Sequence, residues 1–253
     1  MTKFINNLLD DTPSITLEEM DKVALMNRID NKYMFLSKQL HEILKKVKLN
    51  YKILDIEGSK ISKYESFYFD TSKFDFYLWH HNGRLNRYKV RYRKYINSNI
   101  CFFEIKRKTN KGRTIKKRIK VNEVPTVIDN YALDLLKEIV PAHLQVLEKK
   151  IQINFRRMTF VSNDMKERVT VDVDLEFKNG TISKSFPTLV IVEIKRDGIG
   201  IQSPFMKLLH EKNIKETSFS KYCMGVVNLY PSVKYNSFKP KIRFINKLLY
   251  AAA

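Results

Sequence analysis

The octapeptide NRYKVRYR, residues 86–93, carries a basic side chain at every second position. Its basic residues are Arg87, Lys89, Arg91 and Arg93, and aromatic or aliphatic residues alternate with them. Successive side chains of a β-strand point to opposite faces of the sheet. The segment therefore predicts a strand with one charged face and one apolar face.

The same alternation recurs in four other short segments. The charged residues that share a face are Glu104 with Lys106, Lys116 with Arg118, Arg168 with Asp172 and Asp174, and Glu193 with Lys195. Such strands side by side would form a strongly basic surface with a small acidic patch. This surface predicts binding of a polyanion together with a divalent metal.

Composition limits the class of protein. Of the 253 residues, 43% are hydrophobic, which is enough for a sizeable core, and the formal net charge of +20 favours phosphate-rich partners. The two cysteines, Cys101 and Cys223, have no spacing typical of zinc ligands. We find no signal-peptide pattern at the start and no long apolar run, so we expect a cytoplasmic protein.

The pattern of turns and periodicities predicts a mixed succession of strands and helices. Strands are expected at about 28–36, 64–69, 86–96, 100–108, 113–121, 149–161, 167–177 and 188–196. Helices are expected at about 37–48, 73–81, 125–147, 204–211 and 218–229. Thr16 and Glu19 predict a capping box. We expect a lead-in at 1–27, one folded domain at 28–230 and a basic, irregular tail at 231–253.

Periodicity alone does not distinguish an open sheet from a closed barrel, but the apolar faces favour one arrangement. The residues on these faces are Val90, Tyr92, Phe103, Ile105, Ile115, Val171, Val173 and Ile194. They need helices to cover them. We therefore expect an α+β fold built on antiparallel strands, with charges inside and helices outside.

Eight segments, in order, resemble the VTC-type polyphosphate polymerase domain of the triphosphate tunnel metalloenzyme (CYTH-like) superfamily. They are RIDNKY at 28–33, VRYR at 90–93, FEIK at 103–106, IKKR at 115–118, FRRMTF at 155–160, RVTVD at 168–172, VEIK at 192–195 and FSKY at 219–222. The resemblance runs from about Arg28 to Leu229. It implies an eight-stranded antiparallel barrel, with helices packed outside, whose interior binds triphosphate.

The resemblance also implies roles for individual residues. The phosphate-binding residues would be Lys32, Arg91, Arg93, Lys106, Lys116, Arg157, Arg168 and Lys221, with Ser220 as a neutral donor. Glu193 matches the metal-binding carboxylate. Phe155 stands where the family often has Tyr, and Arg28, Asp30 and Lys32 replace the Glu-x-Glu-x-Lys strand of the CYTH branch, which favours the VTC-like branch.

Phosphoryl transfer requires positioning and charge neutralisation more than acid–base groups. Arginines bind phosphate oxygens bidentately and stay charged, so we assign catalysis to Arg91, Arg93, Arg157 and Arg168, together with Lys106 as a point charge. Lys32, Lys116, Arg118, Lys195, Ser220 and Lys221 are predicted to bind substrate. Glu193, with Asp172, Asp174 or Glu104, is expected to hold Mn²⁺ or Mg²⁺.

These assignments predict a metal-dependent polyphosphate polymerase. It would transfer the γ-phosphoryl group of ATP to a growing inorganic polyphosphate chain. The expected partners are ATP and polyphosphate and not nucleic acid, and a membrane-protein partner is an option. A triphosphatase on the same fold, a non-catalytic polyanion sensor and a nuclease built on the two Glu-x-Lys strands remain alternatives. The charged pairs could also be ordinary cross-strand ion pairs. The oligomeric state stays open.

Overall fold

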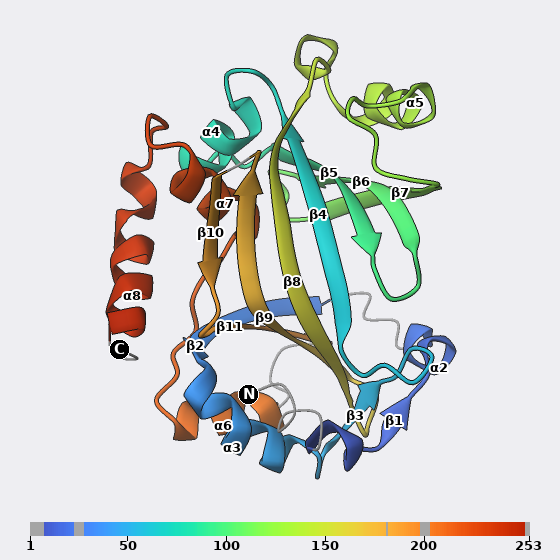
Figure 1. Cartoon of the computed structure of the whole chain (residues 1–253), viewed down its shortest axis with the longest axis vertical. Coiled ribbons are helices and arrows are strands. Elements are labelled where there is room, and N and C mark those ends of the chain that lie inside the picture. Colours follow the sequence, from blue (N-terminus) through green and yellow to red (C-terminus); the bar gives the residue numbers. More distant parts are fainter. Residues whose placement is uncertain (1–7, 23–27, 181, 198–202, 251–253) are drawn as a thin grey trace.

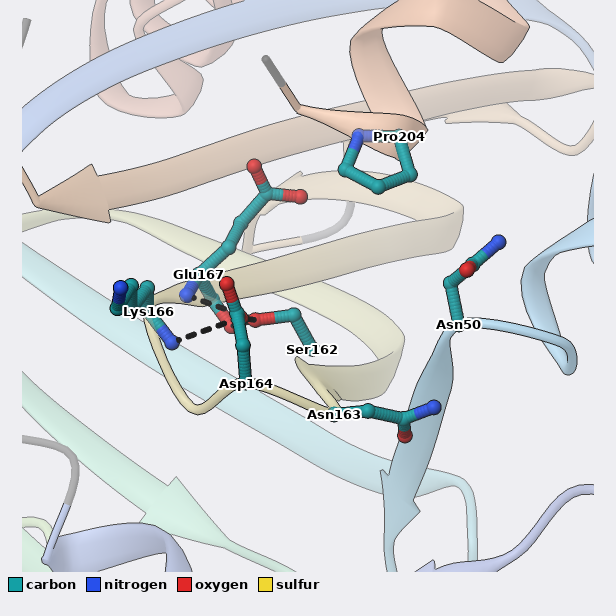
Figure 2. Close-up of a pocket in the computed structure, with 7 residues that line it drawn as sticks. All are labelled: Asn50, Ser162, Asn163, Asp164, Lys166, Glu167 and Pro204. Atoms are coloured by element: carbon teal, nitrogen blue, oxygen red, sulfur yellow. Dashed lines mark hydrogen bonds between the residues drawn. The ribbon is translucent and has the colours of Figure 1, made fainter. Parts of the chain in front are cut away.

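The computed structural model of the chain describes residues 8–22, 28–180, 182–197 and 203–250 (Figure 1). Its long strands are β2 (Arg28–Leu36), β4 (Ser62–Asp70), β5 (Arg87–Tyr95), β6 (Ile100–Lys108), β7 (Thr114–Val121), β8 (Glu148–Ser162), β9 (Glu167–Asn179) and β11 (Leu189–Asp197). Three shorter strands are β1 (Ser14–Ile15), β3 (Tyr51–Leu54) and β10 (Ile182–Phe186).

The helices lie between and around these strands. They are α2 (Leu17–Asp21), α3 (Ser37–Val47), α4 (Asp75–His81), α5 (Asn130–Ile139), α6 (Pro204–Glu211), α7 (Lys221–Leu229) and α8 (Lys239–Tyr250), with 3₁₀ turns at Ala142–Leu144 and Asn236–Phe238. Within the described ranges, no helix is long and apolar enough to cross a membrane.

The eight long strands form one antiparallel path in the order β2-β11-β9-β8-β4-β5-β6-β7. The short strands extend it, since β3 pairs with β8, β10 with β9, and β1 runs parallel to β3. The predicted α+β class and eight-stranded antiparallel arrangement are confirmed. Over the described residues, β2 and β7 are not hydrogen-bonded to each other, so the barrel has an open seam between them.

The sheet curls until strands that are distant in the path face each other. Four strands separate β6 from β11, which in a flat sheet would place them about 24 Å apart. Yet the repulsion of Lys195 on β11 is one of the causes, after burial, that lower the pKa of Lys106 on β6. Lys89 of β5 likewise reaches Ser220, the N-cap of α7, at 3.0 Å. The charged faces of the strands therefore line an interior.

Helices cover the outer, apolar faces of the strands, as the sequence predicts. One core lies between two helices, α3 and α6, on one side and the strands β2, β11, β9 and β8 on the other. It includes Val171, Val192 and Ile194. A second core lies under α4 and α5 and includes Val90 and Phe103. Figure 1 shows α3 and α6 together at the lower end and α5 beyond β5, β6 and β7. The expected covering fails at Ile115 on β7, which is 46% exposed.

One helix lies on the inner side of the curled sheet. Residues of α7 pack against inward-facing apolar residues of the strands, among them Met34, Ile151, Leu175, Phe177 and Ile191. This helix therefore fills the apolar half of the interior. Its first residue, Lys221, lies at the boundary with the charged half, where it pairs with Asp172.

A buried carboxylate fixes this inner helix to the sheet. Asp70, at the end of β4, is 0% exposed and accepts hydrogen bonds from the backbone N–H groups of Thr71, Phe76 and Tyr77 and from the Tyr222 hydroxyl at 2.5 Å. Two of these N–H groups belong to the first turn of α4, and Tyr222 belongs to α7. Asp70 thus joins β4, α4 and α7, because a buried carboxylate needs its lone pairs satisfied.

Several local predictions are corrected by the structure. The tail that was expected to be irregular contains α8, because Ile242, Ile245 and Leu249 recur at helical spacing and pack against the core around α7. The helical region expected at 125–147, with an interruption at Pro141, is shorter: α5 spans Asn130–Ile139, and a 3₁₀ turn at Ala142–Leu144 follows Pro141. Strands β3 and β10 were not predicted. The capping box of Thr16 and Glu19 is confirmed.

We predict that Gly225→Ala destabilises the protein. A methyl group at Gly225 would lie 2.5 Å from Cδ1 of Ile151 and 3.2 Å from Cδ1 of Phe177. Overpacking of this kind costs about 1–3 kcal/mol, partly offset by the better helix propensity of Ala. Thermal unfolding should therefore show a lower Tm. An unchanged or raised Tm would show that α7 is not packed this tightly.

Candidate functional site

Cross-strand register brings most of the predicted charged residues onto one surface, which we call the inner charged face. It consists of Lys32, Lys89, Arg91, Arg93, Glu104, Lys106, Lys116, Arg157, Asp172, Glu193, Lys195 and Lys221. In the sheet, Glu193 pairs with Lys32, Asp172 with Arg157, Arg91 with Glu104, and Lys106 with both Lys89 and Lys116. Alternation along single strands predicts shared faces for most of these residues, the resemblance adds Lys32, Arg157 and Lys221, and the register places the strands side by side.

Glu104 holds two basic side chains in place. It is 0% exposed, accepts a hydrogen bond from Nε of Arg91 at 2.7 Å and forms an ion pair with Lys116. Burial acts to raise the pKa of Glu104, but the charges of Arg91, Arg93 and Lys116 outweigh it and hold the pKa far below its usual value. Glu104 is therefore ionised, with Arg91 hydrogen-bonded to one carboxylate oxygen and Lys116 ion-paired with the other.

Tyr68 gives Arg91 a second fixed contact. The Arg91 guanidinium donates from Nη1 to the Tyr68 hydroxyl at 2.8 Å, and Tyr68 stacks on Tyr222 with ring centres 5.0 Å apart. Burial alone would raise the pKa of this phenol, but the charges of Arg91, Arg93 and Lys89 lower it. Arg91 thus has its orientation set by a carboxylate on one side and a phenol on the other.

Asp172 orients Arg157 in the same way as Glu104 orients Arg91. It is 3% exposed and accepts two hydrogen bonds from Arg157, at 2.6 and 2.8 Å, and a further one from Lys221. Burial opposes ionisation of Asp172, whereas Arg157 and Lys221 lower its pKa to about 2. The bidentate pair fixes the guanidinium plane of Arg157 toward the interior.

Glu193 is the most accessible carboxylate of the inner charged face. Its side chain is 21% exposed, against 3% for Asp172 and 0% for Glu104. It pairs with Lys32 and lies 3.5 Å from Lys195. Burial would raise the pKa of Glu193, but Lys195 and Lys32 hold it well below its usual value.

Three basic residues of the inner charged face, Lys89, Arg93 and Lys106, form no ion pair with any carboxylate in the described ranges, and Lys89 instead donates to Ser220. Arg93 donates to Oγ of Ser66 at 3.1 Å and lies over the rings of Tyr64 and Phe155. Lys106 is partly buried among Arg91, Lys195, Arg93 and Lys116, and its burial together with their repulsion lowers its pKa to about 6. Such an uncompensated cluster is a place where an anion would be stabilised.

The remaining predicted residues lie at the edges of this cluster or outside it. Arg118 is exposed on β7, over the Phe102 ring. Arg168 pairs in register with Lys195, and its Nη2 lies 3.5 Å from the Met20 carbonyl oxygen. Ser220 caps α7 and accepts a hydrogen bond from Lys89.

Asp174 is separated from the other three predicted metal ligands. It has a φ of 52° beside an irregularity in the pairing of β8 with β9, and its partner is Arg156. Because Arg156 and Arg157 are consecutive strand residues, they point to opposite faces. Asp174 therefore accompanies the outward-facing arginine, whereas Asp172 accompanies the inward-facing one.

Glu193 is the carboxylate that best fits a divalent metal. Over the described residues, no three His, Cys, Asp or Glu side chains come close enough to one another to hold a metal ion. Mg²⁺ is commonly bound by one or two carboxylates together with substrate phosphates and water. Glu193 is ionised and partly accessible, so it fits this arrangement, whereas Glu104 and Asp172 are enclosed by their cationic partners.

Sequence reasoning missed two residues of the site, Tyr68 and Lys89. Lys89 shares the period-two face of the octapeptide but was not assigned a role. Tyr68 lies in the aromatic segment SKYESFYF of β4, where Tyr64 and Tyr68 both face inward; Tyr68 is in register with Arg91, and Arg93 lies over the Tyr64 ring. Their even spacing along β4 was the available signal, but only the pairing of β4 with β5 shows that Tyr68 contacts Arg91.

A comparison with protein families identifies the domain. The VTC domain family matches residues 27–230, which is most of the chain. A search of curated proteins gives no match.

Solved structures give matches of low identity. A Hippeastrum protein, described as an adenylyl cyclase with a dominant triphosphatase activity, is 16% identical, with 79% of this chain and 96% of that chain covered and a TM-score of 0.49. A Vibrio parahaemolyticus protein described as an adenylate cyclase is 10% identical (79% and 97% covered, TM-score 0.44). A Pyrococcus horikoshii protein is 12% identical (79% and 99% covered, TM-score 0.45). These likenesses assign no activity to this chain.

We predict that Glu104→Gln destabilises the protein and that a polyanion restores part of the loss. Removing one partner of a buried ion pair typically costs about 3–5 kcal/mol, because the cations left behind are uncompensated. Without ligand, the Tm of the variant should be lower than that of the wild type. Addition of tripolyphosphate should raise the Tm of the variant by more than it raises the Tm of the wild type. If tripolyphosphate raised the Tm of the variant and of the wild type equally, the positioning role of Glu104 would be contradicted.

We predict that Lys106 makes tripolyphosphate binding pH-dependent. Its pKa of about 6 in the free protein means that it is mostly neutral at about pH 8, and bound phosphate would raise that pKa. Binding therefore takes up a proton, and affinity should rise as pH falls from about 8 to 6, by up to about tenfold per unit. Calorimetric titrations across this range measure the effect.

Lys106→Arg supplies the control for this pH dependence, because a guanidinium stays charged over the whole range. Protonation of tripolyphosphate itself affects both proteins equally, so the ratio of their affinities isolates Lys106. A ratio that does not change with pH would show that Lys106 is already charged in the free protein.

Proposed function

The chain belongs to the VTC domain family, and we propose that it is a metal-dependent polyphosphate polymerase. It transfers the γ-phosphoryl group of ATP to the end of an inorganic polyphosphate chain held on the inner charged face. Family membership supports a polyphosphate-related tunnel enzyme. The finer assignment, polymerase rather than triphosphatase, rests on the chemistry of the residues inside the sheet.

The observation that carries this proposal is the excess of positive charge in the interior. Each carboxylate of the inner charged face is already neutralised by two basic side chains, and Lys89, Arg93 and Lys106 are left without such a partner in the described ranges. Lys106, whose pKa is about 6, gains its charge when an anion binds beside it. An enclosed, uncompensated charge of this kind suits a ligand that presents many phosphate oxygens in succession. A linear polyphosphate is such a ligand.

The residues present can position both reactants. Arg91 and Arg157 are held by Glu104 and Asp172 in fixed orientations, so they can bind phosphate oxygens without prior rearrangement. A terminal phosphate oxygen of the chain attacks the γ-phosphorus of ATP. The bond from that phosphorus to the β–γ bridging oxygen breaks, and ADP leaves with the electron pair.

The attacking group determines which side chains the reaction needs. A terminal phosphate is already an anion, so no general base has to remove a proton from it. This agrees with the inner charged face, which contains arginine, lysine and carboxylate but no histidine. The cations stabilise the charge that spreads over the transferring phosphoryl oxygens.

Glu193 is the residue that would hold the metal, with phosphate oxygens and water as further ligands. A bound Mn²⁺ or Mg²⁺ would share the developing charge on the donor triphosphate. Lys32 and Lys195, which pair with Glu193, keep the carboxylate ionised over the physiological range. They are also placed to bind phosphate oxygens beside it.

We predict that Arg157→Ala lowers the rate of polyphosphate synthesis by about 10²–10³, whereas Arg156→Ala leaves it intact. The two arginines are adjacent in β8 and each pairs with an aspartate, but Arg157 faces the interior and Arg156 faces outward. Loss of a group that stabilises the transition state typically costs about 10²–10³ in rate. The assay incubates the full chain with ATP and Mn²⁺ or Mg²⁺ and quantifies polyphosphate and ADP.

Three results of this assay would change the proposal. Free phosphate without polymer identifies a triphosphatase that uses the same residues. Tight binding of tripolyphosphate without either product indicates a sensor. Equal activity of the Arg156→Ala and Arg157→Ala variants would remove the inner charged face from the reaction.

A further inference from the structure

The C-terminal part of the chain carries positive charge without any negative charge. After Glu216, residues 217–253 contain no Asp or Glu. Three basic residues of α8, Lys239, Arg243 and Lys247, are spaced four positions apart and are all exposed. Residues at this spacing lie on one side of a helix, so they form a single basic stripe.

The apolar side of α8 packs against the core, so the basic stripe faces outward. Ile245 is 3% exposed, and Ile242, Leu248 and Leu249 pack against the core around α7. Lys241 is set apart from the stripe, because it turns toward Thr217 and donates to its hydroxyl. Figure 1 shows α8 at the left edge of the molecule, beside β10, with the rest of the fold on one side of it.

Aromatic side chains accompany the stripe. Tyr235, Phe244 and Tyr250 are 39%, 39% and 82% exposed, and Lys239 lies over the Tyr235 ring. Phe244 follows Arg243 in the chain, and Tyr250 lies three residues after Lys247. Together the three cations and three aromatic residues form what we call the α8 surface.

The basic stripe is unfavourable in the isolated molecule, because like charges at this spacing repel each other. Some exposed basic residues elsewhere do have acidic partners: Lys46 pairs with Glu211, and Lys117 with Glu138. Within the described ranges, none of the three stripe cations of α8 forms an ion pair. A partner that supplies negative charge would therefore relieve this repulsion.

We propose that the α8 surface binds the surface of an anionic lipid bilayer. An amphipathic helix with basic residues and exposed aromatic side chains suits the boundary between headgroups and acyl chains. A free polyanion would account for the cations but would leave the aromatic side chains without an apolar partner. A bilayer accounts for both. This docking does not depend on the polymerase assignment.

Sedimentation of the full chain with vesicles tests the proposal. The vesicles are phosphatidylcholine alone or an equimolar mixture of phosphatidylcholine and phosphatidylglycerol. We expect binding to the anionic vesicles only. Each basic residue near such a surface contributes about a fivefold change in affinity, so combining Lys239→Gln, Arg243→Gln and Lys247→Gln should weaken binding about a hundredfold.

The matched control removes the same charge elsewhere by combining Lys22→Gln, Lys45→Gln and Lys207→Gln, all at exposed positions outside α8. This variant should retain most of the binding. A second variant, Phe244→Ala with Tyr250→Ala, should bind the anionic vesicles more weakly while its net charge is unchanged. Circular dichroism verifies that each variant is folded.

Four outcomes would overturn the proposal. They are absence of binding to the anionic vesicles at physiological salt, equal losses in the two charge variants, full binding by the aromatic variant, and an α8 charge variant that loses affinity for long-chain polyphosphate but not for vesicles. The last result would assign the α8 surface to a soluble polyanion.

Discussion

Charge compensation inside a curled sheet is the constraint on which the rest of this structure depends. Glu104, Asp172 and Glu193 point inward, and an isolated carboxylate in such a place would be strongly disfavoured. Each is flanked by two basic side chains, which come from neighbouring strands, from the first residue of α7 or, for Lys195 beside Glu193, from the same strand. The strands must keep their register for these pairs to form, so the electrostatics and the sheet geometry support each other.

This constraint divides the interior into two halves with different roles. In one half, α7 packs against apolar strand residues, and Asp70 ties it to β4 and α4. In the other half, cations outnumber carboxylates, and the carboxylates orient the arginines rather than gathering at one point. The packed half gives the charged half a rigid support, which suits a site that must stabilise phosphoryl transfer by position alone.

Much of the fold could be predicted from the sequence, because the patterns that indicate it involve only residues close together in the chain. The alternation in 86–93 and in the Glu-x-Lys strands depends only on neighbouring residues, and it correctly placed the charges on one face and the apolar residues on the other. The short strands β3 and β10 were missed, since their formation depends on pairing with β8 and β9. Helix α8 was missed because its many lysines obscured an apolar stripe that matters only once the core around α7 exists.

The sequence by itself determined which residues are charged, their alternation along each strand and the family resemblance that these segments carry. Only the tertiary structure decided how they meet. The pairing of β8 with β9 sends Asp172 to Arg157 and Asp174 to Arg156, and the curl of the sheet brings Lys195 near Lys106. The reason is physical. The period of two along one strand sets the face of the sheet to which a side chain points, whereas the register and curvature of strands far apart in the chain set which side chains contact each other.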